Sequence, residues 1–131
     1  MDKQQQGAAN REWGKIAEGL ARDYLYSEGY VIRETGWSSG PGIEIDIVAQ
    51  KDKTIVFVEV KARSGEWGDP LDAVDMKKRR KMVKGADKYM ENFPFPYEYR
   101  FDIITYTGNE QNHVREHIED AFLPGVNGEI R

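Results

Sequence analysis

Four charged residues stand in two stretches that otherwise read as buried strands. Glu44 and Asp46 lie in "GIEIDIVAQ", and Glu59 and Lys61 lie in "TIVFVEVKAR". Burying an unpaired charge is costly, so these residues need either solvent or a chemical role. Strand alternation places Glu44 and Asp46 on one face of the first stretch, opposite its three isoleucines, and gathers Glu59 and Lys61 on one face of the second. Antiparallel pairing through the short "KDK" turn would make Asp46 and Glu59 cross-strand neighbours.

Adjacent carboxylates repel and raise each other's pKa unless a cation lies between them. One or two carboxylates, completed by water and substrate phosphate, are ligands that Mg²⁺ prefers. Lys61 would then hold a phosphate oxygen, or orient or deprotonate an attacking water. The alternative is that Glu59 and Lys61 form a solvated ion pair on the wet face of an antiparallel sheet.

A third carboxylate is predicted to approach the same place from a helix. From Arg11 to Glu28 the apolar residues recur at intervals of three and four, which is typical of an amphipathic helix. Glu18 lies at the border of that apolar stripe, near Ala21 and Leu25, so it can face the sheet. Gly14, one turn earlier, leaves room for this approach.

The elements that would position these residues alternate along the chain. Strands are predicted over 30–37, 43–50, 54–63 and 97–106, and 113–122 is either a fifth strand or a helix. Asp69 and Pro70 predict the start of a second helix that runs to about Asn92. The order α-β-β-β-α-β-(β) predicts an α/β fold with a mixed central sheet flanked by helices. A chain of 131 residues suits one domain; we assign it to 11–123, with a disordered segment over 1–10 and a loose tail over 124–131.

Composition narrows the functional classes. The chain has no cysteine, which excludes disulfides and thiol chemistry, and no apolar run long enough to span a membrane, so we expect a cytoplasmic protein. The net charge of −4 argues against a protein that coats DNA non-specifically. It argues less against an enzyme that recruits divalent cations, because the metal supplies positive charge.

Three other features have both a functional and a structural interpretation. His113 and His117 lack the glutamate of a zincin motif and are not expected to bind metal. Arg100 and Asp102 share a strand face and are expected to form a structural ion pair. Trp67 would either stack on nucleic acid or pack its loop against the core. A cationic patch in "MKKRRKMVKGADK", together with Arg63, is a candidate contact for a phosphate backbone, with the residues Arg63, Lys77, Lys78, Arg80, Lys81 and Lys84.

Four segments together resemble a known family. "GKIAEGLARDYL", "EIDIVA", "FVEVKAR" and "RFDII" resemble, in order and spacing, the bacterial YraN-like family. That uncharacterised family is assigned to the PD-(D/E)XK, or restriction-endonuclease-like, superfamily. The resemblance runs from about Trp13 to Phe122.

The resemblance implies a restriction-endonuclease-like core and four catalytic residues: Glu18, Asp46, Glu59 and Lys61. It implies that Asp46 and Glu59 bind Mg²⁺, or Mn²⁺ in its place, with help from the Val60 carbonyl. Glu44 departs from the family's spacing relative to Gly42, so its role stays open between an outer-shell ligand, a DNA-facing residue and a solvated bystander.

Two functional hypotheses follow. The first is a Mg²⁺-dependent nuclease that hydrolyses DNA phosphodiester bonds, with branched or processed DNA as candidate substrates. The second is a non-catalytic nucleic-acid-binding or assembly module that keeps the nuclease fold and supports protein partners in DNA repair or uptake. The acidic net charge and small size of the chain motivate the second hypothesis.

Overall fold

Two helices flank one five-stranded sheet in a computed structural model that describes residues 2–65 and 68–123. The mixed α/β architecture confirms the fold class predicted from the sequence, and 113–122 is a strand rather than a helix. None of the described helices is long and apolar enough to cross a membrane. The elements are α1 (Lys3–Ser27), β1 (Val31–Gly40), β2 (Ile43–Lys51), β3 (Thr54–Arg63), the 3-10 helix η1 (Pro70–Ala73), α2 (Met76–Met90), β4 (Glu98–Gly108) and β5 (His113–Phe122).

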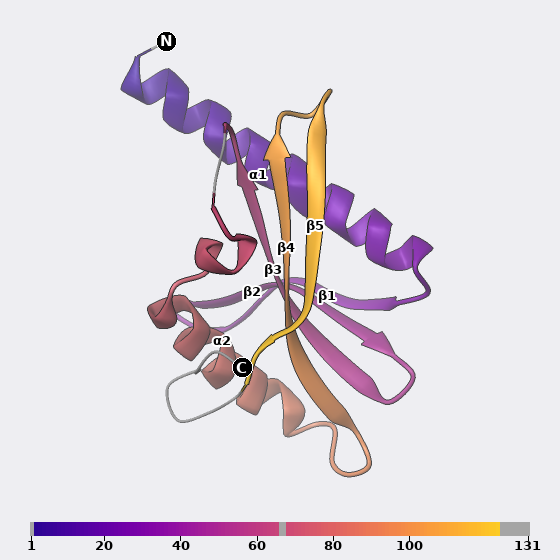
Figure 1. Cartoon of the computed structure of the whole chain (residues 1–131). Helices are drawn as coiled ribbons and strands as arrows, with labels where there is room; N and C mark the ends of the chain where they lie inside the picture. The colour runs from indigo at the N-terminus through magenta and orange to yellow at the C-terminus, as the bar shows by residue number, and fades with distance from the viewer. Residues whose placement is uncertain (1, 66–67, 124–131) are drawn as a thin grey trace.

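The strands lie in the sheet in the same order as in the sequence, β1-β2-β3-β4-β5. Neighbouring strands are antiparallel except β3 and β4, which are parallel and are joined by the segment that contains η1 and α2. A parallel pair needs such a crossover, because a tight turn can only join antiparallel strands. The strand with Glu59 and Lys61, β3, is therefore the central strand of the sheet (Figure 1).

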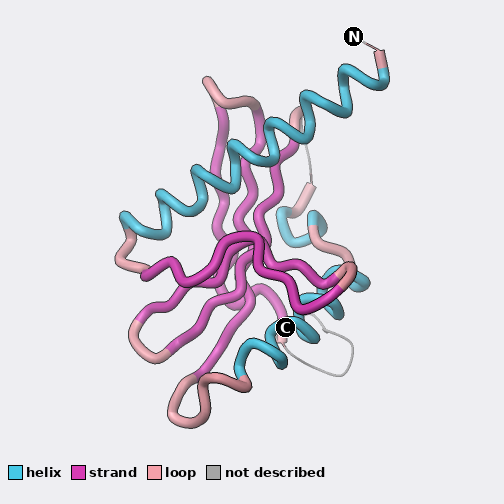
Figure 2. The backbone as a smooth tube through the Cα atoms, turned by 180° about the vertical axis from the view of Figure 1, so that it is seen from behind, coloured by secondary structure: helices cyan, strands magenta, loops and turns pink. Residues whose placement is uncertain are grey.

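Each face of the sheet is covered by one helix. On one face Ala17, Ala21 and Leu25 of α1 pack against alternate residues of β3 and β4. On the other face Met82 and Ala86 of α2 pack against the residues between them. Figure 2 shows α1 crossing the sheet at a steep angle, with its N-terminal end reaching past the strands. Two charged residues of the central strands, Glu59 on β3 and Asp102 on β4, are thus buried.

The first helix begins earlier than its apolar stripe. Over residues 1–10 we expected disorder, but α1 starts at Lys3. Asp2 caps it by accepting from the amide of Gln5, and the Gln5 side chain accepts from the amide of Asp2 in return. This reciprocal cap and the following glutamines and alanines favour a helix without any burial. The expected loose tail over 124–131 lies outside the described residues.

The second helix is shorter than predicted. Asp69 and Pro70 open only the turn of η1, and Val74 is extended before Asp75 caps α2 by accepting from the amide of Lys78. Buried Arg79 holds this break, because its guanidinium donates to the carbonyls of Val74 and Leu71. The single predicted helix is therefore two helices with a capped junction.

Candidate functional site

Asp46 lies where β2 and β3 separate. The ladder between these strands runs from Lys51 and Thr54 as far as Ile47 and Val58. Beyond it a carboxylate oxygen of Asp46 accepts from the Val60 amide at 2.9 Å, replacing the next backbone partner. Since the N–H and C=O of one strand residue point to the same edge, the Val60 carbonyl opens toward Asp46 as well. The side chain of Asp46 is thereby fixed at the gap.

The strand also changes face at Asp46. Ile45 packs in the core beneath α2, whereas Ile47 packs in the core beneath α1. The prediction that these isoleucines share a face is therefore wrong. Strict alternation fails here because β2 leaves the β3 ladder and because Gly36, between the partners of Ile47 and Ile45, adopts a φ of +60°. As a result Asp46 is in reach of side chains from both layers.

Glu59 is the carboxylate on the α2 side of the site. It is 8% exposed, and one of its oxygens lies 3.3 Å from the ammonium of Lys78. The pKa of Glu59 is raised to about 9, mainly by burial and in addition by the hydrogen bond and the charge of Asp46, while Lys78 lowers it. Lys78 alone therefore does not keep Glu59 ionised at neutral pH.

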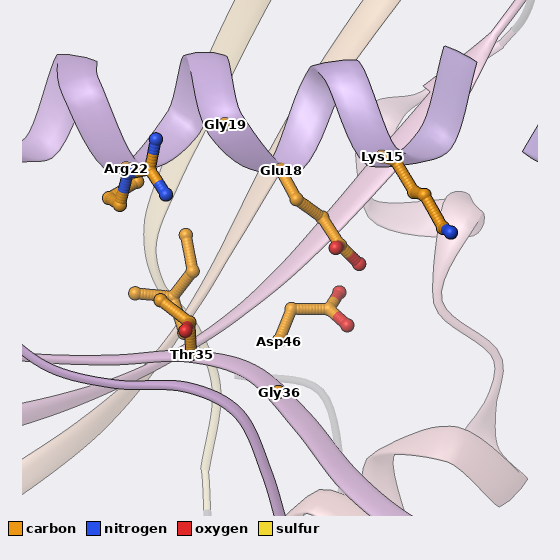
Figure 3. A pocket seen from close by; sticks show the side chains of 8 residues that line it. Lys15, Glu18, Gly19, Arg22, Thr35, Gly36 and Asp46 are labelled. Atoms are coloured by element: carbon orange, nitrogen blue, oxygen red, sulfur yellow. The ribbon is translucent and has the colours of Figure 1, made fainter. Parts of the chain in front are cut away.

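Glu18 is the carboxylate on the α1 side. Figure 3 shows its carboxylate and that of Asp46 pointing toward one another. The pKa of Glu18 is raised to about 7, mainly by partial burial. The charge and hydrogen bonding of Asp46 and the charge of Glu44 also raise this pKa, while the charge of Lys15 lowers it. Solvent reaches Glu18 and screens part of this repulsion. Asp46 therefore interacts with both glutamates, as the predicted convergence requires.

Lys78, and not Lys61, is the lysine that contacts Glu59. Lys61 is exposed and forms no ion pair with another described residue, so the alternative interpretation, a solvated Glu59–Lys61 ion pair, is wrong. Lys78 takes that place, and its ammonium also donates to the Glu44 carbonyl at 3.2 Å. Sequence reasoning assigned Lys78 only to the cationic patch, because a run of consecutive cations gives no signal for the one that turns inward.

The proposed nucleic-acid contacts divide into two groups. Lys77, Arg80 and Lys84 are exposed on α2, and Lys81 is half-buried with its ammonium beside Gly42. Arg63, in contrast, is 7% exposed and donates to the Thr107 hydroxyl, so its position does not favour contact with a phosphate backbone. Trp67 lies outside the described residues.

The histidines and the Arg100–Asp102 pair form structural networks. Arg100 donates to Asp102 at 2.9 Å, as expected, and His117 lies 2.7 Å from the same buried carboxylate. The other ring nitrogen of His117 lies 2.9 Å from the Tyr24 hydroxyl. This chain joins β4, β5 and α1 on the face away from Glu59.

Comparison with known proteins extends the resemblance seen in the sequence. Residues 17–106 match the model of "Uncharacterised protein family UPF0102". The chain belongs to the UPF0102 family. Its relatives include UPF0102 proteins of Bacteroides thetaiotaomicron (43% identical; 89% of this chain and 97% of that protein), Phocaeicola vulgatus (40%; 91% and 98%) and Myxococcus xanthus (35%; 91% and 95%).

The carboxylates of this UPF0102 protein provide oxygen ligands, which hard cations such as Mg²⁺ prefer. No three Asp, Glu or His residues among those described are grouped tightly enough to hold a metal ion as they stand. Mg²⁺, however, commonly uses one or two carboxylates and keeps several waters. Asp46 and Glu59 would supply that pair, and the Val60 peptide lies against Asp46. Burial is the main cause of the raised pKa of Glu59, the hydrogen bond and charge of Asp46 add to it, and a bound cation would favour the ionised form.

Proposed function

We propose that this protein is a Mg²⁺-dependent nuclease that hydrolyses DNA phosphodiester bonds. The observation that carries the proposal is the position of Asp46, bound to the Val60 amide at the gap between β2 and β3 and close to both Glu18 and Glu59. Such crowding of carboxylates is destabilising without a cation, so it is better explained by a binding role than by a structural one.

Different residues of the site would have different roles in the proposed reaction. Asp46 and Glu59, with the Val60 carbonyl, would hold the cation; Mn²⁺ would serve in its place. When bound, Mg²⁺ would neutralise charge on the reacting phosphate and make water more acidic. A pKa of about 7 suits Glu18 for accepting a proton from the attacking water. Exposed Lys61 would contact a phosphate oxygen or orient that water.

The test is a panel of branched, flapped, nicked and single-stranded DNA substrates, incubated with the full chain and Mg²⁺ or Mn²⁺. We expect cleavage of at least one substrate, its loss with a chelator, and its loss in Asp46→Asn. The matched control is Asp23→Asn, which makes the same chemical change at an exposed position on α1. A panel that stays intact, or cleavage that survives Asp46→Asn, would contradict the proposal.

A second candidate function is supported by Lys78. Its ammonium already pairs with Glu59, and an internal cation of this kind would suit a non-catalytic nucleic-acid-binding or assembly module, with partners in DNA repair or uptake. The two candidates differ in their response to metal. Mg²⁺ should raise the melting temperature of a nuclease by mass action and leave that of the module nearly unchanged.

A further inference from the structure

A cavity of about 400 Å³ lies between α1 and strands β1 and β2, beside the carboxylates. From α1 it is lined by Lys15, Glu18, Gly19 and Arg22, and from the sheet by Thr35, Gly36, Asp46 and Ile47. Figure 3 shows the helix above, the β1 segment below, and the carboxylates of Glu18 and Asp46 between them. The cavity is therefore continuous with the proposed catalytic site through Asp46.

Glycine keeps this space open. A Cβ added at Gly19 would meet only the end of the Arg22 side chain, at 3.9 Å, and one added at Gly36 would meet nothing within 4 Å. The buried stripe of α1, Ala17 and Ala21, packs against the core on the other side of the helix axis. No side chain of the described residues fills the gap toward β1, so the cavity can admit a ligand.

Cations stand at both ends of the cavity with the carboxylates between them. Lys15 and Arg22 are seven residues apart, two turns of helix and about 10 Å along its axis. The ammonium of Lys15 acts on Glu18, since it lowers the pKa of that carboxyl. Within the described ranges the one ion pair of Arg22 is with Asp23, at 3.5 Å and in solvent, and such surface pairs contribute little. Both cations are therefore available to an anionic ligand.

The size and lining of the cavity indicate the kind of ligand. A volume of about 400 Å³ falls in the range of pockets for small ligands, comparable to one nucleotide and too small for stacked base pairs. The lining offers charges, a threonine hydroxyl and glycine backbone, and contains no aromatic ring. A phosphate and sugar would be recognised there more strongly than a particular base.

We propose that this cavity binds one unpaired nucleotide of a DNA strand, with one flanking phosphate held by Lys15 and the other by Arg22, so that the strand passes beside Asp46. The inference rests on the proposed function, because it takes DNA to be the substrate. It defines the substrate class: the protein acts where a strand is unpaired, as at a flap, a gap or a single-stranded end, and a continuous duplex is excluded.

Binding is measured by fluorescence anisotropy with a labelled thymidine oligonucleotide and with a duplex of equal length, in a chelator so that no cleavage occurs. Wild type should bind the single strand more tightly than the duplex. Gly19→Leu fills the cavity from a helical position with open space, so it should weaken single-strand binding about tenfold or more without lowering the melting temperature. Lys15→Ala and Arg22→Ala should each reduce the slope of the logarithm of the binding constant against the logarithm of the salt concentration by about 1.

Lys53→Ala is the matched control, since Lys53 is exposed in the turn between β2 and β3; it should bind as wild type does. The proposal is overturned if Gly19→Leu, Lys15→Ala and Arg22→Ala all bind the single strand within about twofold of wild type, a difference of under 0.5 kcal/mol. Equal wild-type affinity for duplex and single strand would also overturn it. Cleavage by wild type and Asp46→Asn is scored separately, so failure of the cavity proposal is distinguishable from failure of the nuclease proposal.

Discussion

At the scale of single residues, a substitution of Asp46 tests whether this side chain binds a cation or stabilises the fold. In Asp46→Asn the amide oxygen can still accept from the Val60 amide, while the repulsion with Glu18 and Glu59 is removed. The metal-free variant should therefore be as stable as wild type or slightly more stable, and its melting temperature should no longer respond to Mg²⁺.

Thermal unfolding with and without Mg²⁺ measures both effects, and Asp23→Asn provides the reference. A clear loss of stability in the metal-free variant with an unchanged response to Mg²⁺ would show that Asp46 is structural. Asp46→Ala offers a further comparison: it leaves the Val60 amide without its acceptor, which costs about 1–3 kcal/mol if the amide stays buried.

The raised pKa values of Glu18 and Glu59, about 7 and about 9, predict how stability depends on pH. Both exceed the ordinary value of 4.5, so the folded protein binds more protons than the unfolded chain between these limits. The stability of the metal-free protein should therefore fall as the pH rises from about 5 to about 9. Ionised carboxylates bind Mg²⁺ better, so the stabilisation by Mg²⁺ should increase over the same range.

Urea unfolding at several pH values, with and without Mg²⁺, measures this linkage. Glu59→Gln should flatten the dependence in the metal-free protein, because it removes the group with the largest rise. Stability that increases across this range, or a Mg²⁺ effect that is largest at low pH, would contradict the assignment.

At the scale of elements, the close approach of α2 to β2 determines where the cationic helix lies relative to Asp46. A Cβ at Gly85 would stand 3.0 Å from Ile45 Cδ1 and 3.2 Å from Ile43 Cγ2. Gly85→Ala should therefore destabilise the protein by a net ~1 kcal/mol or more, although alanine is the better helix former.

Gly14→Ala on α1 is the matched control, because nothing lies within 4 Å of its added Cβ. It should stabilise the protein by up to about 1 kcal/mol through helix propensity alone. Chemical denaturation of the two variants gives the comparison, and equal effects at the two glycines would show that α2 does not pack tightly on β2.

The sequence predicted the elements better than the directions of their side chains. Periodicity located β2, β3 and the buried face of α1, and the two-residue turn fixed which strands pair. It could not show the change of face at Asp46, because that depends on where a ladder ends. Nor could it separate Lys78 from its cationic neighbours, or show that Arg63 is buried, since both depend on how α2 and α1 close over the sheet.

At the scale of the whole molecule, Asp102 links the β4–β5 hairpin to the first helix. Its buried carboxylate accepts from Arg100 and from the amide of Asp120, and it contacts His117, which in turn contacts Tyr24 on α1. Hydrogen bonds from these groups lower the pKa of Asp102 in spite of its burial. The stability it contributes is therefore present above its ordinary value of 3.8 and is lost as the pH falls through the lower folded value.

Asp102→Asn should destabilise the protein by about 2–3 kcal/mol at neutral pH, because Arg100 loses its charged partner inside the fold. The loss should shrink at acid pH, where wild type loses the same charge. Urea unfolding at neutral and acid pH tests this, with exposed Asp87→Asn as the control. A change of under about 0.5 kcal/mol at neutral pH, the size expected of an ordinary surface substitution, would contradict it.

The identity of strand order and chain order has a consequence for how the protein is made. The ribosome synthesises helix α1 and the strands β1, β2 and β3 first, and these segments carry Glu18, Asp46 and Glu59. Helix α2, with Lys78, is synthesised after them. The nascent chain thus contains all three carboxylates of the site before Lys78, which pairs with Glu59, has been synthesised. Glu59 therefore leaves the ribosome before Lys78, so its ion pair with Lys78 forms only once α2 has been synthesised, and dissolved cations can reach that carboxylate first.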